Sequence, residues 1–201
     1  MRENKPDTKA LILNAALRLF AASGVENVSM RDLADDVGIK AASIYNHFPS
    51  KDEIVEACYD YYLQYHDAGR LNKEQYSLVL LEGTKEEIVN IPIEQFPEDL
   101  AENMFYAMIV LFSRIYTDSA AIIKYTQMID HSMEFLMEFL DLGIKLGRFD
   151  NFIVRGVSML MLSSRLFAAQ SVTIHPEALS DWDIAQKEMT SELMNIIPFR
   201  Y

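Results

Sequence analysis

The side chains with the clearest chemical potential lie between Ser29 and Lys51, and many of them are hydrogen-bond donors. Hydroxyl, imidazole and ammonium groups stand at four of these positions: Ser29, Tyr45, His47 and Lys51. Groups of these types donate to phosphate oxygens, most readily near a helix N-terminus. Arg31 could reach either a phosphate or a base edge. The chemistry indicated here is binding to a nucleic acid.

A second group in the same stretch has side chains that suit base edges. Its members are Lys40, Ala41, Ala42, Ser43 and Asn46. Lysine donates to guanine, asparagine pairs with adenine, and alanine methyl groups pack against the thymine methyl group. Together the two groups combine residues that position a duplex with residues that distinguish its bases.

Capping signals predict the helices that carry these residues. Ser29 can cap one helix, with Asp32 three residues later returning a bond. Gly38 ends that helix, because glycine takes the left-handed conformation that a helix C-terminus often needs. Ser50 and Glu53 form a capping box for the helix that follows.

Between these helices, Ile39 and Ile44 bracket a second short helix of about two turns. Ala34 is small where two helices would cross, and Gly38 stands in the turn between them. This layout is that of a helix-turn-helix, whose second helix enters a major groove. The alternative is a buried helical hairpin with a solvated polar side, in which Tyr45, Asn46 and His47 would make poor packing residues.

These residues resemble a known family. The segment GIKAASIYNHFPSKDEI is similar to the recognition-helix segment of the tetracycline-repressor (TetR) family, and ILNAALRLFAASGVENVSMRDLADDVGI is similar to its first two helices. The resemblance covers about residues 8–55. It implies phosphate contacts at Ser29, Tyr45, His47 and Lys51. Lys40 and Ala42 depart from the family pattern, which often has serine or threonine and glycine at these positions, so the resemblance does not imply an operator sequence.

Charge is divided unevenly along the 201 residues, whose net charge is −12. Residues 1–51 carry seven Lys/Arg and six Asp/Glu, whereas the rest carries eleven and twenty-four. The acidic load therefore lies outside the segment expected to meet DNA, although that segment is only weakly basic. Asp35 and Asp36 are expected on the helix face turned away from DNA.

Cysteine usage and hydropathy indicate the compartment. The one cysteine, Cys58, rules out an internal disulfide and fits a reducing cytosol, so a cytoplasmic location is expected. No signal-peptide pattern follows the charged N-terminus. Apolar runs such as 104–112 are too short to span a bilayer, so no membrane partner is expected.

Helical periodicity continues along the whole chain and predicts an all-α fold. An N-terminal three-helix head at residues 1–50 would be followed by a helical domain at 51–201, with the helix at 51–66 as the connection. Residues 67–97 are expected to be irregular or broken into short helices. The remaining predicted helices are 98–117, 119–147, 151–173 and one that begins after Ser180.

The resemblance implies a ligand pocket between the helices at 98–117 and 119–147. Methionine and aromatic side chains suit a lining that re-packs around a largely apolar effector. The expected lining residues are Met104, Met108, Phe112, Tyr125, Met128, His131 and Phe135. The alternative is that most of them are plain core.

The resemblance also implies a homodimer formed by the last two helices of each subunit. The expected interface residues are Leu160, Ser164, Phe167, Ala168, Trp182, Met189 and Leu193. The alternative is that these helices are buried within one subunit.

Motifs for catalysis and metal binding are absent from the sequence. It contains no Glu-x-x-His, no Cys-x-x-Cys, no glycine-rich phosphate loop and no Gly-x-Ser-x-Gly elbow. We therefore expect no metal, no cofactor and no enzymatic activity. The leading hypothesis is a ligand-responsive regulator, acting as a homodimeric repressor on a palindromic site in double-stranded DNA. An architectural, nucleoid-associated DNA-binding factor and a helical enzyme or ligand carrier are the alternatives.

Overall fold

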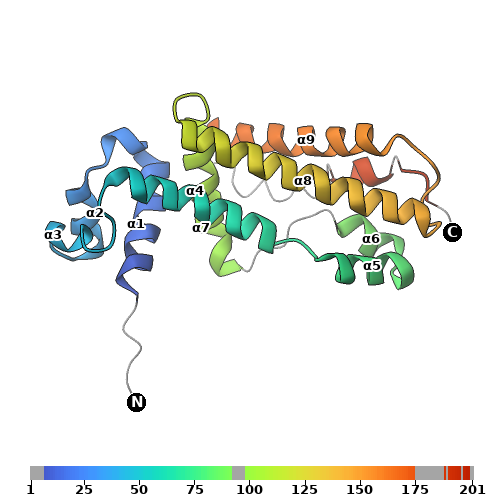
Figure 1. Cartoon of the computed structure of the whole chain (residues 1–201), viewed down its shortest axis with the longest axis horizontal. Helices are drawn as coiled ribbons and strands as arrows, with labels where there is room; N and C mark the ends of the chain where they lie inside the picture. The colour runs from blue at the N-terminus through green and yellow to red at the C-terminus, as the bar shows by residue number, and fades with distance from the viewer. Residues whose placement is uncertain (1–6, 92–97, 175–187, 189, 196, 200–201) are drawn as a thin grey trace, which may run out of the picture. The chain divides into compact units, whose positions relative to one another are not determined.

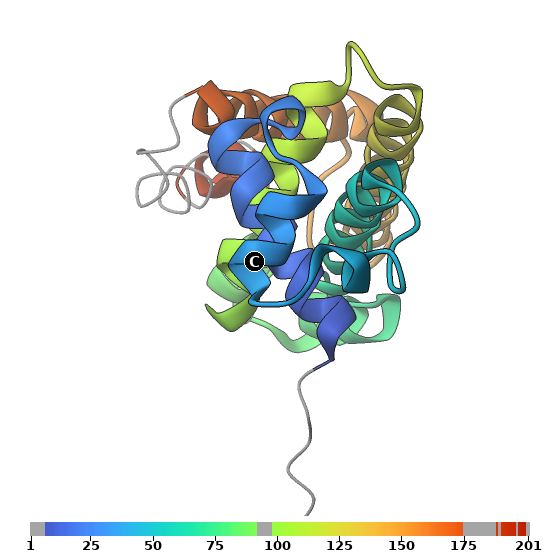
Figure 2. The ribbon, with the colours of Figure 1, turned by 90° about the vertical axis from the view of Figure 1, so that its left-hand side faces the viewer.

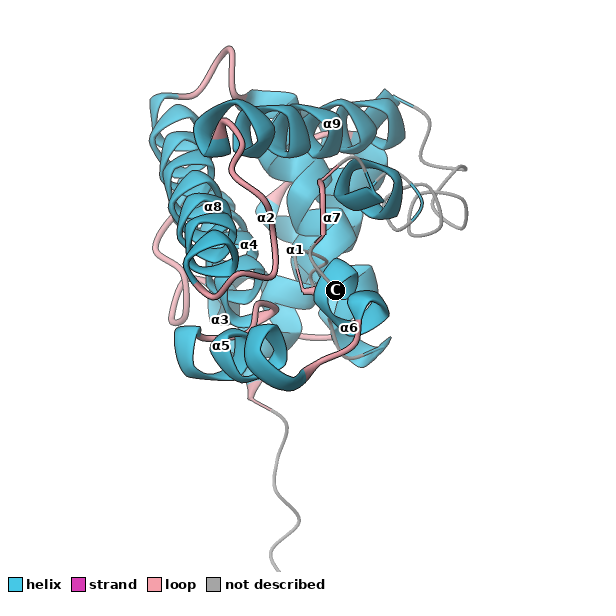
Figure 3. Ribbon diagram, turned by 90° about the vertical axis from the view of Figure 1, so that its right-hand side faces the viewer, coloured by secondary structure: helices cyan, strands magenta, loops and turns pink. Residues whose placement is uncertain are grey.

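The computed structural model describes residues 7–91, 98–174, 188, 190–195 and 197–199. Within these ranges the chain forms helices, turns and loops, with one isolated antiparallel bridge between Phe149 and Phe199 (Figure 3). The predicted all-α fold is confirmed. In the described part no single helix has the length and hydropathy of a membrane span, although α7 and α8 meet that test as a bent pair.

The helices follow the predicted order closely (Figure 1). They are α1 (Thr8–Ser23), the 3₁₀ turn η1 (Val25–Asn27), α2 (Met30–Val37), α3 (Ala41–Ile44), α4 (Lys51–Ala68), α5 (Lys73–Glu82), α6 (Lys85–Asn90), α7 (Glu98–Arg114), α8 (Ser119–Lys145) and α9 (Val154–Ile174). Residues 190–195 are also helical. The stretch predicted to be irregular or broken holds the two short helices α5 and α6.

The chain divides into two compact units. The first comprises residues 1–65 and 96–125, and the second residues 66–95 and 126–201. In the first unit α7 packs against α1. The compact unit therefore includes α7 in addition to the head that the sequence predicts at residues 1–50. The functional boundary after residue 50 stays a prediction.

The core of the first unit is built around α1, which contacts both α2 and α7. The N-terminal helices are blue in Figure 2. Ile12, Ala15, Ala16 and Phe20 are buried at helical spacing. Leu17 is fully buried as well, and Leu19 is only partly covered. A helix contacted on two sides buries a wider band than a single stripe, which explains the additional buried position at Leu17.

The core of the second unit is rich in aromatic side chains. Phe139 and Phe149 meet edge to face with ring centroids 6.0 Å apart, and Phe149 packs against Phe199 at 5.0 Å. Gly143 on α8 allows this arrangement, because a Cβ atom there would overlap the Phe149 ring. Gly147, just past the helix, has φ +71°, but a Cβ atom there would meet no atom within 4 Å beyond its chain neighbours.

Replacing Gly143 by alanine should therefore destabilise the protein, although alanine in a helix normally stabilises. We expect Gly143→Ala to lower the free energy of unfolding by about 1–3 kcal/mol through overpacking against Phe149. Urea unfolding measures this. The comparison variant Gly147→Ala should cost about 1 kcal/mol, from backbone strain alone. An unchanged or increased stability of Gly143→Ala would contradict the packing described here.

Candidate nucleic-acid interface

Local hydrogen bonds fix both ends of α2. The Ser29 hydroxyl accepts from the Asp32 N–H at 3.2 Å, and the Asp32 carboxylate accepts from the Ser29 N–H at 2.8 Å. The Ser29 hydroxyl also donates to this carboxylate at 2.7 Å, and the bonds that the carboxylate accepts from the Ser29 side chain and backbone lower the pKa of Asp32. At the other end Gly38 takes φ 75°, and the Ile39 N–H donates back to the Ala34 carbonyl at 2.9 Å. The chain therefore turns sharply between α2 and α3.

Helix α3 has four residues, about one turn rather than the two that the sequence predicted. Residues 45–47 continue as hydrogen-bonded turns, with the His47 N–H donating to the Ile44 carbonyl at 2.8 Å. Pro49 limits any continuation of the helix, because the residue before it, Phe48, is disfavoured in the helical conformation. Ile44 and Phe48 are buried and anchor the segment from below.

Around these anchors, the predicted DNA-contact residues remain accessible. Tyr45 is 52% exposed. The other exposed members are Ser29, Arg31, Lys40, Ala42 and Asn46, and the half-buried ones are Ala41, Ser43, His47 and Lys51. All ten belong to the first unit. Their contacts with DNA stay a prediction.

Two arginines form ion pairs with Asp35 and Asp36 of α2. Nη2 of Arg18 in α1 donates to both carboxylate oxygens of Asp36, each at 2.7 Å. This hydrogen-bonded pair raises the pKa of Arg18, against the opposing effect of burial. Asp35 stands 3.8 Å from Arg31 in a highly exposed pair. The Asp36 charge is thus directed at α1.

Lys51 has a role that the sequence did not reveal. Its ammonium Nζ donates to the backbone carbonyls of Val25 at 2.9 Å and Val28 at 3.2 Å. Val25 begins η1 and Val28 follows it, so the first turn of α4 holds the turn that leads into α2. The partners lie 26 and 23 residues away in sequence, and no local pattern signals such a contact.

A cavity of about 320 Å³ lies in the second unit. Its lining residues are Asp67, Arg70, Leu71, Asn72, Lys73, Tyr76, His131, Glu134, Phe135 and Glu138. His131 and Asp67 are 2.7 Å apart, and Lys73 lies 3.2 Å from Glu138. Burial acts to raise the pKa of Asp67, but hydrogen bonds with His66 and His131 outweigh it and lower the pKa. Charged and polar side chains therefore line this cavity together with the aromatic rings of Tyr76 and Phe135.

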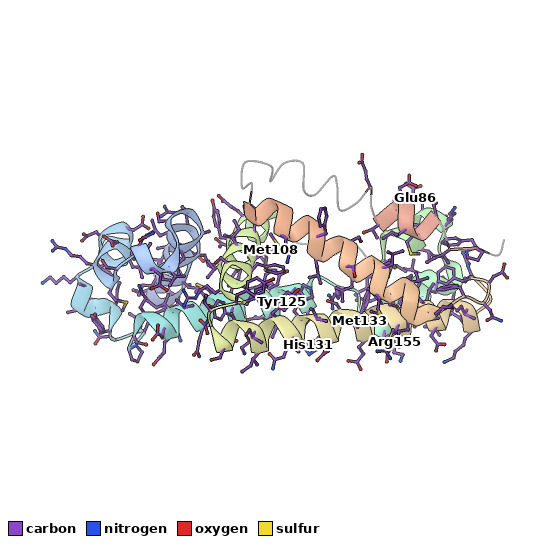
Figure 4. All side chains as sticks on the ribbon, turned by 90° about the horizontal axis from the view of Figure 1, so that it is seen from above. Glu86, Met108, Tyr125, His131, Met133 and Arg155 are labelled. Carbon is purple, nitrogen blue, oxygen red and sulfur yellow. The ribbon has the colours of Figure 1, made fainter. Side chains whose placement is uncertain are left out.

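Only two of the residues predicted to line a pocket, His131 and Phe135, belong to this cavity. Met104, Met108, Phe112 and Met128 are buried, and Tyr125 is half-buried with its ring edge-on to Phe112 at 5.4 Å. Figure 4 labels Met108 on α7 and both Tyr125 and His131 on α8. The sequence missed Asp67, Arg70, Tyr76 and Glu138 as lining residues, although the i, i+3, i+4, i+7 spacing of 131, 134, 135 and 138 marks one face of a helix.

The predicted interface residues on α9 include two large exposed side chains. Leu160 is 54% exposed and Phe167 is 69% exposed. Ser164 on α9 and Leu193 near the C-terminus are half-buried. Ala168 falls within α9, but its side chain is not described, and Trp182 and Met189 lie outside the described residues.

The first unit thus contains a helix-turn-helix with a polar, accessible second element. A family model described as bacterial regulatory proteins, tetR family, matches residues 12–58. The regulator TtgR of Pseudomonas putida is 36% identical over 66 residues, which are 33% of this chain and 31% of that protein. The negative regulator IcaR of Staphylococcus aureus is 40% identical over 57 residues, 26% of this chain and 31% of that protein. The matching segment spans about a third of the length of these curated relatives.

Solved structures match over nearly the whole chain. A TetR transcription regulator from Haloarcula marismortui has a TM-score of 0.69 at 16% identity, covering 96% of this chain and 99% of that one. The TetR-family regulator PfmR from Thermus thermophilus has a TM-score of 0.64 at 21% identity, covering 92% and 95%. At these identities the likeness shows the fold. Residues 12–58 therefore match the TetR family of bacterial regulatory proteins, which are transcriptional regulators.

Removing the Lys51 ammonium should loosen the turn before α2. We expect Lys51→Ala to lower the free energy of unfolding by about 1–3 kcal/mol, because two partly buried carbonyls lose a charged donor. Chemical denaturation measures the change. Lys40→Ala is the matched control, since Lys40 is exposed and should change stability by less than about 0.5 kcal/mol. Equal stabilities of the two variants would contradict the role of Lys51 as a clamp.

Proposed function

We propose that this protein is a sequence-specific DNA-binding transcriptional regulator that acts as a homodimeric repressor on a palindromic operator. The observation that carries the proposal is the accessibility of the segment 40–47. This segment is anchored by Ile44 and Phe48, and all its other residues are at least partly accessible. A short element held in this way, with donors on its outer side, suits entry into a major groove.

The names of relatives support a negative regulatory role. IcaR is named as a negative transcriptional regulator, and KstR2 of Mycolicibacterium smegmatis, 42% identical over 45 residues, is named as a repressor. These alignments cover 26% and 22% of this chain. A repressor would occupy its site and thereby exclude the transcription machinery.

Selection of bound duplexes from a random DNA pool tests sequence-specific binding. An enriched palindrome is expected for the wild-type protein, because a two-fold symmetric dimer presents two recognition segments. Failure to enrich any sequence, together with retained binding to bulk DNA, would support the alternative of an architectural factor.

Variants in the recognition segment should then separate base contacts from phosphate contacts. Lys40→Ala should change the enriched sequence, because a lysine that donates to guanine distinguishes bases by about 1–3 kcal/mol. Tyr45→Phe should weaken binding to all duplexes alike, because a phosphate contact carries no sequence information. Repeating the selection and measuring Kd by gel shift checks both. An unchanged enriched sequence for Lys40→Ala would remove Lys40 from the base-reading residues.

The exposed face of α9 supports the homodimer. Ile153, just before α9, and Leu160 and Phe167 on α9 lie at seven-residue intervals and are 80%, 54% and 69% exposed. Apolar residues at this spacing form a stripe along one side of a helix. Gly156, Ser163 and Ser164 are small residues near this stripe that permit close approach of a second helix. A second copy of the chain would cover this surface.

A charge placed in the stripe should break the dimer. We expect Phe167→Asp to raise the dimer dissociation constant by about 30- to 700-fold, since an anchor of this kind contributes on the order of 2–4 kcal/mol. Sedimentation velocity at several protein concentrations measures it. Leu78→Asp is the matched control, because Leu78 on α5 is 55% exposed outside the stripe. Dissociation caused equally by both variants would argue against α9 as the interface.

The proposal also includes a response to a small-molecule effector. The predicted effector is largely apolar, with Met104, Met108, Phe112, Tyr125 and Met128 as its expected contacts. The charged cavity around His131 and Phe135 favours an effector that also carries polar groups. A regulatory effect of ordinary size requires the effector to bind the two states with affinities that differ by about 1–3 kcal/mol.

A further inference from the structure

Within the first unit, a chain of polar contacts joins η1 to α4, α7 and the start of α8. Arg114, the last residue of α7, places Nη1 2.7 Å from Oε1 of Glu26 in η1. The same guanidinium places Nε 3.4 Å from Oδ2 of Asp118. The Tyr59 hydroxyl of α4 donates to that Asp118 oxygen at 2.8 Å. One arginine therefore connects the turn before α2 with the turn before α8.

The inner part of this network is shielded and the outer part is exposed. The side chains of Arg114 and Asp118 are 21% and 20% exposed, whereas that of Glu26 is 78% exposed. Hydrogen bonding to Glu26, with smaller effects of Tyr59 and Asp118, raises the pKa of Arg114 against burial. Burial acts to raise the pKa of Asp118, but bonds from Tyr59, the Ala120 N–H and Arg114 lower it overall. Both groups are thus held in their charged forms.

Asp118 also fastens the start of α8. Its Oδ1 accepts from the Ala120 N–H at 2.9 Å, which satisfies one of the free donors of the helix N-terminus. The guanidinium of Arg114 is therefore held at a fixed place by a helix end and by a tyrosine of α4. From that place it reaches Glu26, three residues before Ser29, the N-cap of α2.

We propose that Arg114 is a positioning residue for DNA recognition. Its ion pair with Glu26 sets the position of η1, and hence of α2 and α3, relative to α4 and α7. This inference rests on the proposed DNA-binding function. Loss of the pair leaves the fold intact but lets the recognition segment take several positions, so that specific binding weakens more than non-specific binding.

The negative charge of Glu26 allows a positioning role to be distinguished from simple repulsion between its carboxylate and the DNA phosphates. An exposed carboxylate in a DNA-binding unit repels phosphates, so its removal should strengthen binding to every duplex if the charge acts only at a distance. A positioning role predicts the opposite for the selected site. Since exposed ion pairs are weak, the expected loss of specific affinity is about three- to tenfold.

The test compares Glu26→Gln, Arg114→Gln and the double variant with the wild-type protein. Fluorescence anisotropy gives Kd for the duplex selected by the wild-type protein and for a random-sequence duplex, at a temperature where all proteins are folded. Each single variant should lower the ratio of specific to non-specific affinity by about three- to tenfold, and the double variant should lose no more than Arg114→Gln alone. A purely structural defect would reduce the folded fraction and both affinities equally, leaving the ratio unchanged.

The matched control is Lys124→Gln, which breaks the pair between Lys124 Nζ and Asp60 Oδ1, 2.7 Å apart in the same unit. This pair joins α8 to α4 and does not involve η1, so the ratio should stay at the wild-type value. A Glu26→Gln variant that binds the selected duplex as tightly as the wild-type protein, or more tightly, overturns the positioning role. If the wild-type protein itself prefers no duplex, the proposed function fails and this inference fails with it.

Discussion

The recognition segment depends on the burial of two side chains beneath a helix too short to be stable by itself. A single helical turn costs more conformational entropy than its hydrogen bonds return, so the four residues of α3 need tertiary support. Ile44 is completely buried and Phe48 is 3% exposed, and these two positions bind the segment to the rest of the first unit. With the inner side occupied in this way, residues 40–43 and 45–47 remain at least partly accessible.

The elements around this segment limit how it can move. Gly38 turns the chain by its left-handed conformation, and Pro49 follows the segment on the other side, where it disfavours a helical Phe48. Lys51 clamps the backbone before α2, while Arg18 neutralises Asp36 on its α1 side. The accessible polar residues are thus supported by buried apolar side chains and by a few long-range polar contacts. Such support suits a binding site that must keep a fixed geometry.

Much of this frame could be predicted from sequence, because its signals are local. The cap at Ser29, the stop at Gly38 and the start near Ser50 depend on residues within one helical turn, and all three were predicted correctly. The contacts that were missed depend on partners distant in the chain. Lys51 contacts carbonyls more than twenty residues away. The polar cavity in the second unit likewise requires the end of α4, α5 and α8 to come together.

Hydrogen–deuterium exchange of the full-length protein, with and without the duplex selected from a random pool, tests the central claim most directly. Protection on adding DNA should concentrate in residues 29–51, where both the phosphate-contact and base-contact residues lie. A matched duplex of unrelated sequence should give weaker protection of the same residues. Protection confined to the acidic second unit, or none at residues 40–47, would contradict the conclusion that this segment reads DNA.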